Sequence, residues 1–407
     1  MKTEAFRFCG LGVVALTLLV TACSSRQQVP TDGNVELVQA AVEIPEAKLL
    51  DVGIQVFDPG LPEDESELPP DVFPEVRRSE ARWIAIQLKE TLQETGQWGA
   101  VRVVHVAGQA LDVKVTGRII QSTGKELVVQ ILASDSTGRV WINSRYKHVT
   151  SGATYTESDQ LADRDPFQAL YHQISNHLVA ARTDLESDEI REIRQVSELQ
   201  FAADLAPVPF SDYLVVDRKG RYEVARLPAA RDPMMDRVVR IREREYMFVD
   251  TLNQHYANFY TDMSEPYDSW RQFSYEEQMA LEKLRRKART QKILGALAVL
   301  SAMFAQVDSG AEAAIRDAAA IGGMAAIQAG LATSKEAKIH VEALKELGAS
   351  FEAEVEPLVI EVEGQTLRLS GSVETQYETW RELLREIYAT ETALPLDPNT
   401  NIDPDAR

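Results

Sequence analysis

Residues 111–117 read Leu-Asp-Val-Lys-Val-Thr-Gly, and Leu127, Val129 and Ile131 repeat the same alternation further along the chain. Apolar residues at every second position are typical of β-strands with one buried face. Ser122-Thr123-Gly124 and Asp135-Ser136-Thr137-Gly138 follow these two stretches, and the second turn leads into residues 140–148. Glycine-containing turns at this spacing favour hairpins. The stretch therefore predicts a meander of three antiparallel strands.

Further elements are expected on both sides of the meander. An apolar stretch at 49–57 and another at 100–106 predict strands, and they flank a predicted helix at 76–95. Gly96 is placed as the C-cap of that helix, and a second amphipathic helix is expected at 166–182. Residues 45–182 thus predict an α/β domain with the order β-α-β-β-β-β-α. The whole chain is predicted to be α+β.

The rest of the chain is predicted to be mostly helical. Residues 183–273 are expected to form a connector of helices and one β-hairpin, with a helix at 234–263 that Pro266 ends. Residues 274–350 predict a long helical hairpin whose distal half is apolar and rich in small residues. Residues 351–392 predict a β-hairpin followed by a helix, and residues 393–407 a disordered tail rich in Pro, Asp and Asn.

The first residues have the pattern of a secretion signal. Phe8 to Val20 is an apolar run after Lys2 and Arg7, and it is shorter than the ~20 residues that cross a bilayer. It ends in Val20-Thr21-Ala22-Cys23, which resembles the lipobox of bacterial lipoproteins. The resemblance implies a signal peptide over residues 1–22, lipid attached to Cys23, and a lipidated tether over residues 23–44.

The residues after Cys23 carry the expected location. Ser24 and Ser25 lack the aspartate that favours inner-membrane retention in enterobacterial lipoproteins, so the resemblance implies the periplasmic face of the outer membrane. The chain has only two cysteines, Cys9 and Cys23, so beyond residue 23 it offers no disulfide, cysteine zinc site or thiol nucleophile.

Composition restricts the class of partner. The 407 residues carry a net charge of −20, which disfavours binding to nucleic acid. Hydrophobic residues make up 44% of the chain, which is enough for a sizeable core.

The order of elements in residues 45–182, together with the run Glu-Thr-Gly-Gln-Trp-Gly-Ala-Val-Arg-Val-Val at 94–104, resembles small periplasmic domains. The families concerned are the TolB N-terminal region and the CsgG-like lipoproteins. The resemblance covers about a third of the chain and brings no catalytic residue with it, so it implies a fold and no chemistry.

The helical hairpin is the candidate functional region. Its first helix ends in a basic cluster that could meet anionic headgroups, formed by Lys283, Arg285, Arg286, Lys287, Arg289 and Lys292. Small residues that permit close helix contact follow on both predicted arms: Gly295, Ala298, Ala302, Gly322, Gly323, Ala326 and Gly330. Three interpretations stay open, in which the hairpin lies in the protein's own core, packs against other copies, or dips into the outer membrane.

No catalytic or metal-binding motif is found in the sequence. The histidines show no metal-ligand spacing, and the acidic run at residues 63–67 lies in a proline-rich loop where carboxylates are solvated. We therefore expect no catalytic residue, metal or cofactor. The sequence predicts a non-catalytic, homo-oligomeric accessory subunit of envelope assembly or export, anchored in the outer membrane. The alternative is a monomeric adaptor that binds a protein or an envelope glycan.

Overall fold

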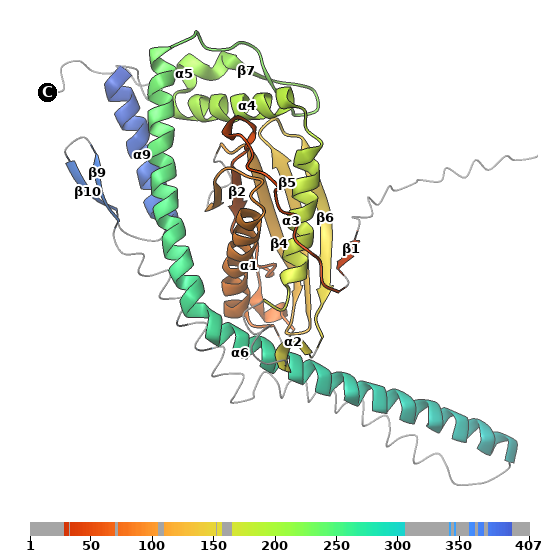
Figure 1. Cartoon of the computed structure of the whole chain (residues 1–407). Coiled ribbons are helices and arrows are strands. Elements are labelled where there is room, and N and C mark those ends of the chain that lie inside the picture. The colour runs from red at the N-terminus through yellow and green to blue at the C-terminus, as the bar shows by residue number, and fades with distance from the viewer. Residues whose placement is uncertain are drawn as a thin grey trace, which may run out of the picture.

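The computed structural model describes residues 28–31, 33–69, 72–104, 110–151, 153–156, 165–305, 342, 346, 358–362, 365–369 and 373–392. Helices and strands are mixed in these residues, and the predicted α+β class is confirmed in that coarse form. Figure 1 shows a sheet with helices packed on it, and one very long helix, α6, running past this body.

The main sheet has six strands in the order β1-β6-β5-β4-β2-β3. The predicted meander is present: β4 pairs antiparallel with β5, and β5 pairs antiparallel with β6. Strand β2 lies parallel to both β3 and β4, so the sheet is mixed. The strands are β1 (Gln28–Thr31), β2 (Val52–Gln55), β3 (Val101–Val104), β4 (Val113–Ser122), β5 (Glu126–Asp135) and β6 (Val140–Val149).

Two helices, α1 (Pro74–Glu94) and α3 (Gln168–Thr183), build the first core with the sheet. Ile84, Leu88 and Leu92, the predicted apolar stripe of α1, are buried there. Gly96 follows α1 with a φ of +62°, the left-handed conformation that favours glycine after a helix. Short elements connect these pieces: Glu46–Lys48 and Glu65–Glu67 are 3-10 turns, and α2 spans Ala153–Thr156.

A second core lies between α4 (Ser187–Leu205), the first half of α6 (Pro233–Ala305) and α9 (Val373–Thr392). Trp380 of α9 stacks on Phe248 of α6 with a ring-centroid distance of 5.5 Å. Between α4 and α6 come α5 (Pro207–Phe210), the 3-10 turn Ser211–Tyr213, and the predicted hairpin of β7 (Leu214–Val216) and β8 (Tyr222–Val224). The predicted second hairpin is also present, as β9 (Leu358–Val362) and β10 (Gln365–Leu369).

The prediction that Pro266 ends a helix is wrong. Helix α6 has 73 residues and Pro266 lies inside it, so the predicted boundary between residues 273 and 274 also falls within one helix. An internal proline costs about 3 kcal/mol because it removes a hydrogen bond and crowds the preceding turn. Met263, Tyr267 and Trp270 flank the proline and are buried against Val76 and Trp83 of α1, which offsets that cost.

Residues 28–44 do not form the free tether that the sequence predicts. Strand β1 pairs in parallel with β6 from Gln28–Arg145 to Thr31–His148. Beyond β1, the Asn176 side chain accepts from the backbone N–H of Val38 at 2.8 Å and donates to the carbonyl of Glu36 at 2.8 Å. The polar composition of this stretch concealed the pairing, because its hydrogen bonds are made by the backbone and by residues more than 100 positions away.

The predicted helical hairpin at 274–350 is described only in part. Its first arm continues α6 to Ala305, whereas most of the predicted second arm lies outside the described residues. Residues 393–407 and Cys23 also lie outside them.

Candidate functional site

Helix α6 is fixed to the sheet edge by side chains that replace a neighbouring strand. The Asn253 amide oxygen accepts from the N–H of Val103 at 2.7 Å, and its NH2 group donates to the Val103 carbonyl at 3.0 Å. Arg102, also on β3, makes a two-pronged contact to Asp250, with Nε–Oδ1 at 2.7 Å and Nη2–Oδ2 at 3.1 Å. These contacts satisfy backbone groups of β3, which would otherwise be an open sheet edge.

A buried ion pair fixes α6 further along its length. The Arg271 guanidinium donates to Asp165 at 2.7 Å, and both side chains are 2% exposed. Trp83 of α1 donates to the same carboxylate at 2.9 Å, and Tyr267 donates to Glu80 at 2.9 Å. The arrangement joins α1, α6 and the segment that leads into α3, because each buried acid accepts from a group on another element.

The turn between β4 and β5 touches α6 just after this ion pair. A Cβ atom on Gly124 would collide with the carbonyl of Arg271 and the N–H of Tyr275, so only glycine lets the turn approach this closely. The N–H of Gly124 donates to the Ser274 hydroxyl at 3.1 Å, and Lys125 pairs with Glu282. Ser274, the first residue of the predicted helical hairpin, lies within α6.

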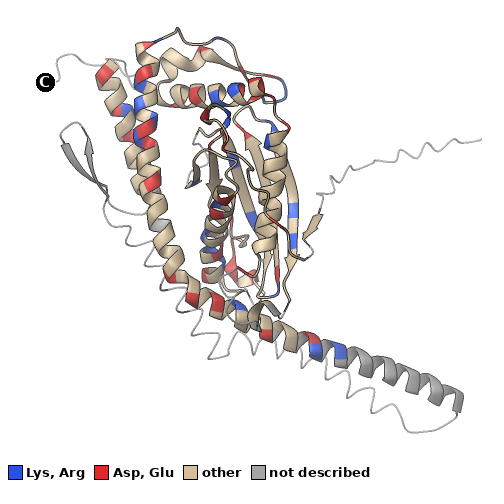
Figure 2. Cartoon of the chain, in the orientation of Figure 1, with Lys and Arg blue, Asp and Glu red and all other residues tan. Residues whose placement is uncertain are grey.

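The last part of α6, residues 283–305, is here called the arm. Figure 1 shows the arm leaving the body beyond α2. Lys283 and Arg286 of the predicted basic cluster are exposed, and Arg286 pairs with Glu282 of the preceding turn at 3.1 Å. Figure 2 shows basic and acidic residues close together on α6 where the helix leaves the body.

The structure places the other predicted site residues only in part. Arg285, Lys287, Arg289, Lys292, Gly295, Ala298 and Ala302 lie on α6, but their side chains are outside the description. Gly322, Gly323, Ala326 and Gly330 lie outside the described residues altogether.

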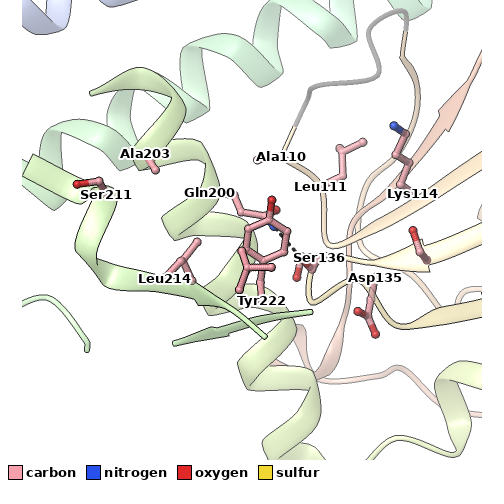
Figure 3. Close-up of a pocket in the computed structure, with 13 residues that line it drawn as sticks. Ala110, Leu111, Lys114, Asp135, Ser136, Gln200, Ala203, Ser211, Leu214 and Tyr222 are labelled. Carbon is pink, nitrogen blue, oxygen red and sulfur yellow. Dashed lines mark hydrogen bonds between the residues drawn. The ribbon is translucent and has the colours of Figure 1, made fainter. Parts of the chain in front are cut away.

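A pocket of about 540 Å³ lies where the sheet meets α4 and the β7–β8 hairpin. Figure 3 shows Gln200, Leu214 and Tyr222 on one side of it and Lys114 and Asp135 on the other. Two hydrogen bonds hold the walls together: the N–H of Tyr222 donates to the Thr137 carbonyl at 2.9 Å, and Gln200 donates to the Ser136 carbonyl at 2.9 Å. Its walls are Ala110, Leu111, Lys114, Ser134, Asp135, Ser136, Gly138, Gln200, Ala203, Ser211, Leu214, Val216 and Tyr222.

Lys114 and Asp135 are the two charged side chains that line the pocket. Asp135 accepts from Thr137 Oγ1 at 2.6 Å and from Trp141 Nε1 at 2.8 Å, and it lies 3.9 Å from the Arg139 guanidinium. These donors and the nearby guanidinium stabilise the Asp135 carboxylate. Lys114 brings an ammonium group whose pKa burial lowers. An anionic group in the pocket would favour the charged form of this lysine.

The pocket continues onto the sheet face that lies opposite α1 and α3. On β4 and β5, Lys114 pairs with Ser134, Thr116 with Leu132 and Arg118 with Gln130. Gln130 in turn pairs with Arg145 of β6. These side chains are half-buried or exposed, unlike the buried residues that alternate with them. We call this surface the open sheet face: Lys114, Thr116, Arg118, Gln130, Leu132, Asn143, Arg145 and Lys147. Its acidic neighbours are Asp58, 3.4 Å from Arg118, and Glu126, 2.7 Å from Lys147.

The sequence did not predict the pocket. Its walls come from two turns, α4 and a hairpin that are separated by up to 112 positions, and neither wall has a motif. The signal that could have pointed to it is the pair of valines in β7, Val215 and Val216, which are 48% and 57% exposed. Exposed aliphatic residues beside a turn are consistent with a docking surface.

Two neighbouring acids, Asp51 and Asp112, have the composition of a catalytic pair. Burial raises the pKa of Asp112, and the nearby Arg242 opposes this rise. However, Asp112 accepts from the Asp51 N–H at 3.0 Å, and Asp51 accepts from the Ala100 N–H at 2.8 Å. Both carboxylates thus hold strand ends in place, and neither lines the pocket.

His177 contacts the buried Tyr146 hydroxyl through Nδ1 at 2.8 Å. Burial lowers the pKa of His177. Among the described residues there is no cluster of three or more metal-binding side chains. Within that same part of the chain, none of the helices combines the length and apolar character needed to cross a bilayer.

Comparison with known proteins gives no assignment. No family model, no curated protein and no solved structure matches this chain significantly. The resemblance of residues 45–182 to the TolB N-terminal region and CsgG-like domains therefore stays a prediction from the order of elements.

Proposed function

We propose that this chain is a non-catalytic accessory subunit of envelope assembly or export, anchored through Cys23 at the periplasmic face of the outer membrane and associating with copies of itself through the arm. The observation that carries the proposal is the path of α6. One continuous helix is fixed to the body by buried contacts at Asn253 and Arg271 and then leaves it.

The arm has the composition of an interaction element. Its 23 residues would extend about 35 Å at the rise of an α-helix. The basic cluster occupies its beginning, and the apolar run 293–305 occupies its end. Gly295, Ala298 and Ala302 are three and four residues apart and so share one helix face, where small side chains permit close helix packing. An apolar helix of this kind is stabilised when a partner covers it.

The position of β1 restricts where the body would lie. If Cys23 carries lipid, only five positions separate the anchor from Gln28, a reach of at most about 18 Å. The edge formed by β1 and β6 would then be held near the membrane. In Figure 1 the arm extends toward the side of the body on which β1 lies, so the outer membrane is the competing partner for the apolar end of the arm.

The proposal is tested by the mass of the mature, lipidated protein in mild detergent, measured by light scattering after gel filtration. We expect a discrete oligomer that deletion of residues 293–332 converts to a monomer. Replacing Ala298 and Ala302 together by leucine should also weaken the oligomer, because larger side chains separate the helices. Leu300→Phe, on the opposite side of the helix, is the matched control and should leave the mass unchanged.

The pocket supports a second candidate function, the monomeric adaptor. A mixed polar and apolar cavity of about 540 Å³ is large enough to hold one or two side chains of a partner protein. A monomeric mass for the intact lipidated chain would contradict the assembly proposal and favour the adaptor.

A further inference from the structure

The turn of the β7–β8 hairpin presents three cations to solvent. Arg218, Lys219 and Arg221 lie within four consecutive positions, and all three are exposed. In the described part of the chain, their side chains form no ion pair. The neighbouring Asp217 accepts from the backbone N–H groups of Lys219 at 2.7 Å and Arg221 at 2.8 Å. These bonds, the one from Arg221 above all, lower the pKa of Asp217 and close the turn.

Apolar side chains accompany this charge. Val215 and Val216, on the strand that leads into the turn, are 48% and 57% exposed. Residues 214–227 hold four basic and two acidic residues, in a chain whose net charge is −20. Aliphatic side chains beside exposed cations are typical of elements that bind a lipid surface. The cations contact anionic headgroups there, and the apolar groups enter the boundary below them.

Backbone contacts hold the turn in place at one end of the main sheet. The N–H of Tyr222 donates at 2.9 Å to the carbonyl of Thr137, in the turn between β5 and β6. A Cβ atom on Gly138 of that turn would lie 3.2 Å from the carbonyl oxygen of Gly220, so the two turns are in contact. The three cations are thus presented by a preorganised element, which reduces the entropy lost on binding.

This end of the sheet is also the end at which β1 begins. The pairs between β1 and β6 run from Gln28–Arg145 toward His148, so the first residue of β1 is the one nearer to Gly138. Arg145 lies seven positions from Gly138, about 23 Å along an extended strand. A lipid anchor at Cys23 reaches about 18 Å from Gln28. The anchor can therefore lie within about 10 Å of the hairpin turn.

From these observations we infer that the β7–β8 hairpin binds anionic phospholipid headgroups of the membrane that holds the chain. The three cations contact the phosphate groups, and the two valines lie at the boundary with the acyl chains. The inference rests on the proposed function, because the membrane in question is the one that the lipid on Cys23 would enter. Since the net charge of −20 repels an anionic surface, the hairpin determines which face of the body approaches the membrane.

Fluorescence quenching by vesicles tests this inference in the full chain, with Cys9 and Cys23 replaced by serine so that the result does not depend on lipidation. A single cysteine, Val215→Cys on the hairpin or Met247→Cys on α6, carries an environment-sensitive dye. Both positions are well exposed, at 48% and 63%. The vesicles contain brominated phosphatidylcholine as the quencher, with or without phosphatidylglycerol. We expect phosphatidylglycerol to strengthen quenching at the hairpin at least tenfold and to leave the α6 site unquenched.

The charge contribution is tested with the dye on the hairpin. Arg221→Gln should weaken quenching about fivefold, because each cation near an anionic surface contributes to binding. Arg240→Gln removes an exposed cation from α6 and is the matched control, which should leave quenching unchanged. Both side chains are exposed, so neither change is expected to affect folding. Reading the dye on the hairpin also separates its contact from any binding of the basic cluster on the arm.

Equal quenching at the hairpin and at α6, or none at either with phosphatidylglycerol present, would overturn the inference. A hairpin dye that responds to polyglutamate and not to the vesicles would also overturn it and assign the hairpin to an acidic protein. The mass of the N-terminal peptide of the wild-type chain tests lipidation separately. A lipidated Cys23 without quenching at the hairpin would contradict this inference alone, whereas an unmodified Cys23 would contradict the anchor of the proposed function.

Discussion

Arg271 is the side chain through which the middle of α6 is held. Its guanidinium pairs with Asp165 at 2.7 Å and with Asp268 at 2.5 Å, and its carbon Cζ lies 4.3 Å from the ring centre of Tyr267. A charge this deeply buried is tolerated only while its partners remain, because desolvation of an unpaired ion is costly.

Arg271→Met should therefore destabilise the protein strongly. Among the described residues, the Trp83 N–H and the Phe167 backbone N–H then remain as donors to the buried Asp165 carboxylate. Removal of one member of a buried pair costs about 3–5 kcal/mol. The free energy of unfolding, from urea denaturation, measures the loss. Arg240→Met changes an exposed arginine of the same helix and should cost less than about 0.5 kcal/mol. Similar losses for the two variants would show that the Arg271 ion pair contributes little.

His177 gives the fold a dependence on pH. Because burial lowers its pKa, the folded chain holds the ring neutral at a pH where the unfolded chain, with an ordinary pKa of about 6.5, binds a proton. The free energy of unfolding should thus fall as the pH drops below about 6.5 and stop falling below the folded pKa. His177→Gln keeps an acceptor for the Tyr146 hydroxyl and should reduce this slope in denaturation curves at pH 5 to 7. An unchanged slope would contradict the assignment.

At the scale of elements, Asn253 lets a helix take the place of a seventh strand beside β3. Asn253→Leu would leave the N–H and carbonyl of Val103 buried without these partners, at a cost of about 1–3 kcal/mol for each group. We expect a loss of about 3 kcal/mol and faster hydrogen exchange at the Val103 amide. Asn258→Leu, exposed on the same helix, is the control. Unchanged exchange at Val103 in the Asn253 variant would show that the edge is protected in another way.

Elements with a strong period were predictable, because their pattern records which face is buried. Val113 and Val115 lie in β4, the first strand of the antiparallel meander, and Ile84, Leu88 and Leu92 are in the core as expected. Pro266 was misleading because the free-energy cost of a proline within a helix is offset by packing of Met263 and Tyr267 against α1. Sequence rules that consider only neighbouring residues do not include such packing. Strand β1 was missed for the same reason, since its partner β6 lies more than 100 residues away.

The candidate sites differ in how well they could be predicted from the sequence. The residues of the basic cluster lie within ten consecutive positions, so the cluster could be found from the sequence alone. Two of its residues, Lys283 and Arg286, are exposed in the structure. The pocket depends on the hydrogen bond between Tyr222 and Thr137, which brings a hairpin onto a turn of the sheet. Neither residue is unusual in its own surroundings, so only the folded chain shows that they meet.

At the scale of the whole molecule, two hydrophobic clusters hold the first part of α6 against the body. The arm extends past both of these clusters. The core with α4 and α9 contains Phe248 and Leu252, and the cluster against α1 contains Phe259, Met263 and Tyr267. Because both clusters hold the same helix, the direction in which the arm leaves is coupled to the packing of the body. A partner that binds the arm would then bind it in a fixed orientation relative to the sheet.

Limited trypsin digestion can show whether the arm is covered in the assembled protein. The basic cluster at 283–292 offers several cleavage sites, and the exposed turn at Arg218, Lys219 and Arg221 provides an internal reference within the same molecule. If arms pack on one another, raising the protein concentration through the assembly range should slow cleavage in the cluster about tenfold, because proteolysis follows the uncovered population. Cleavage at the reference turn should not change. Equal slowing at both sites would mean that assembly covers the body as well, and no slowing at either would place the partner of the arm elsewhere.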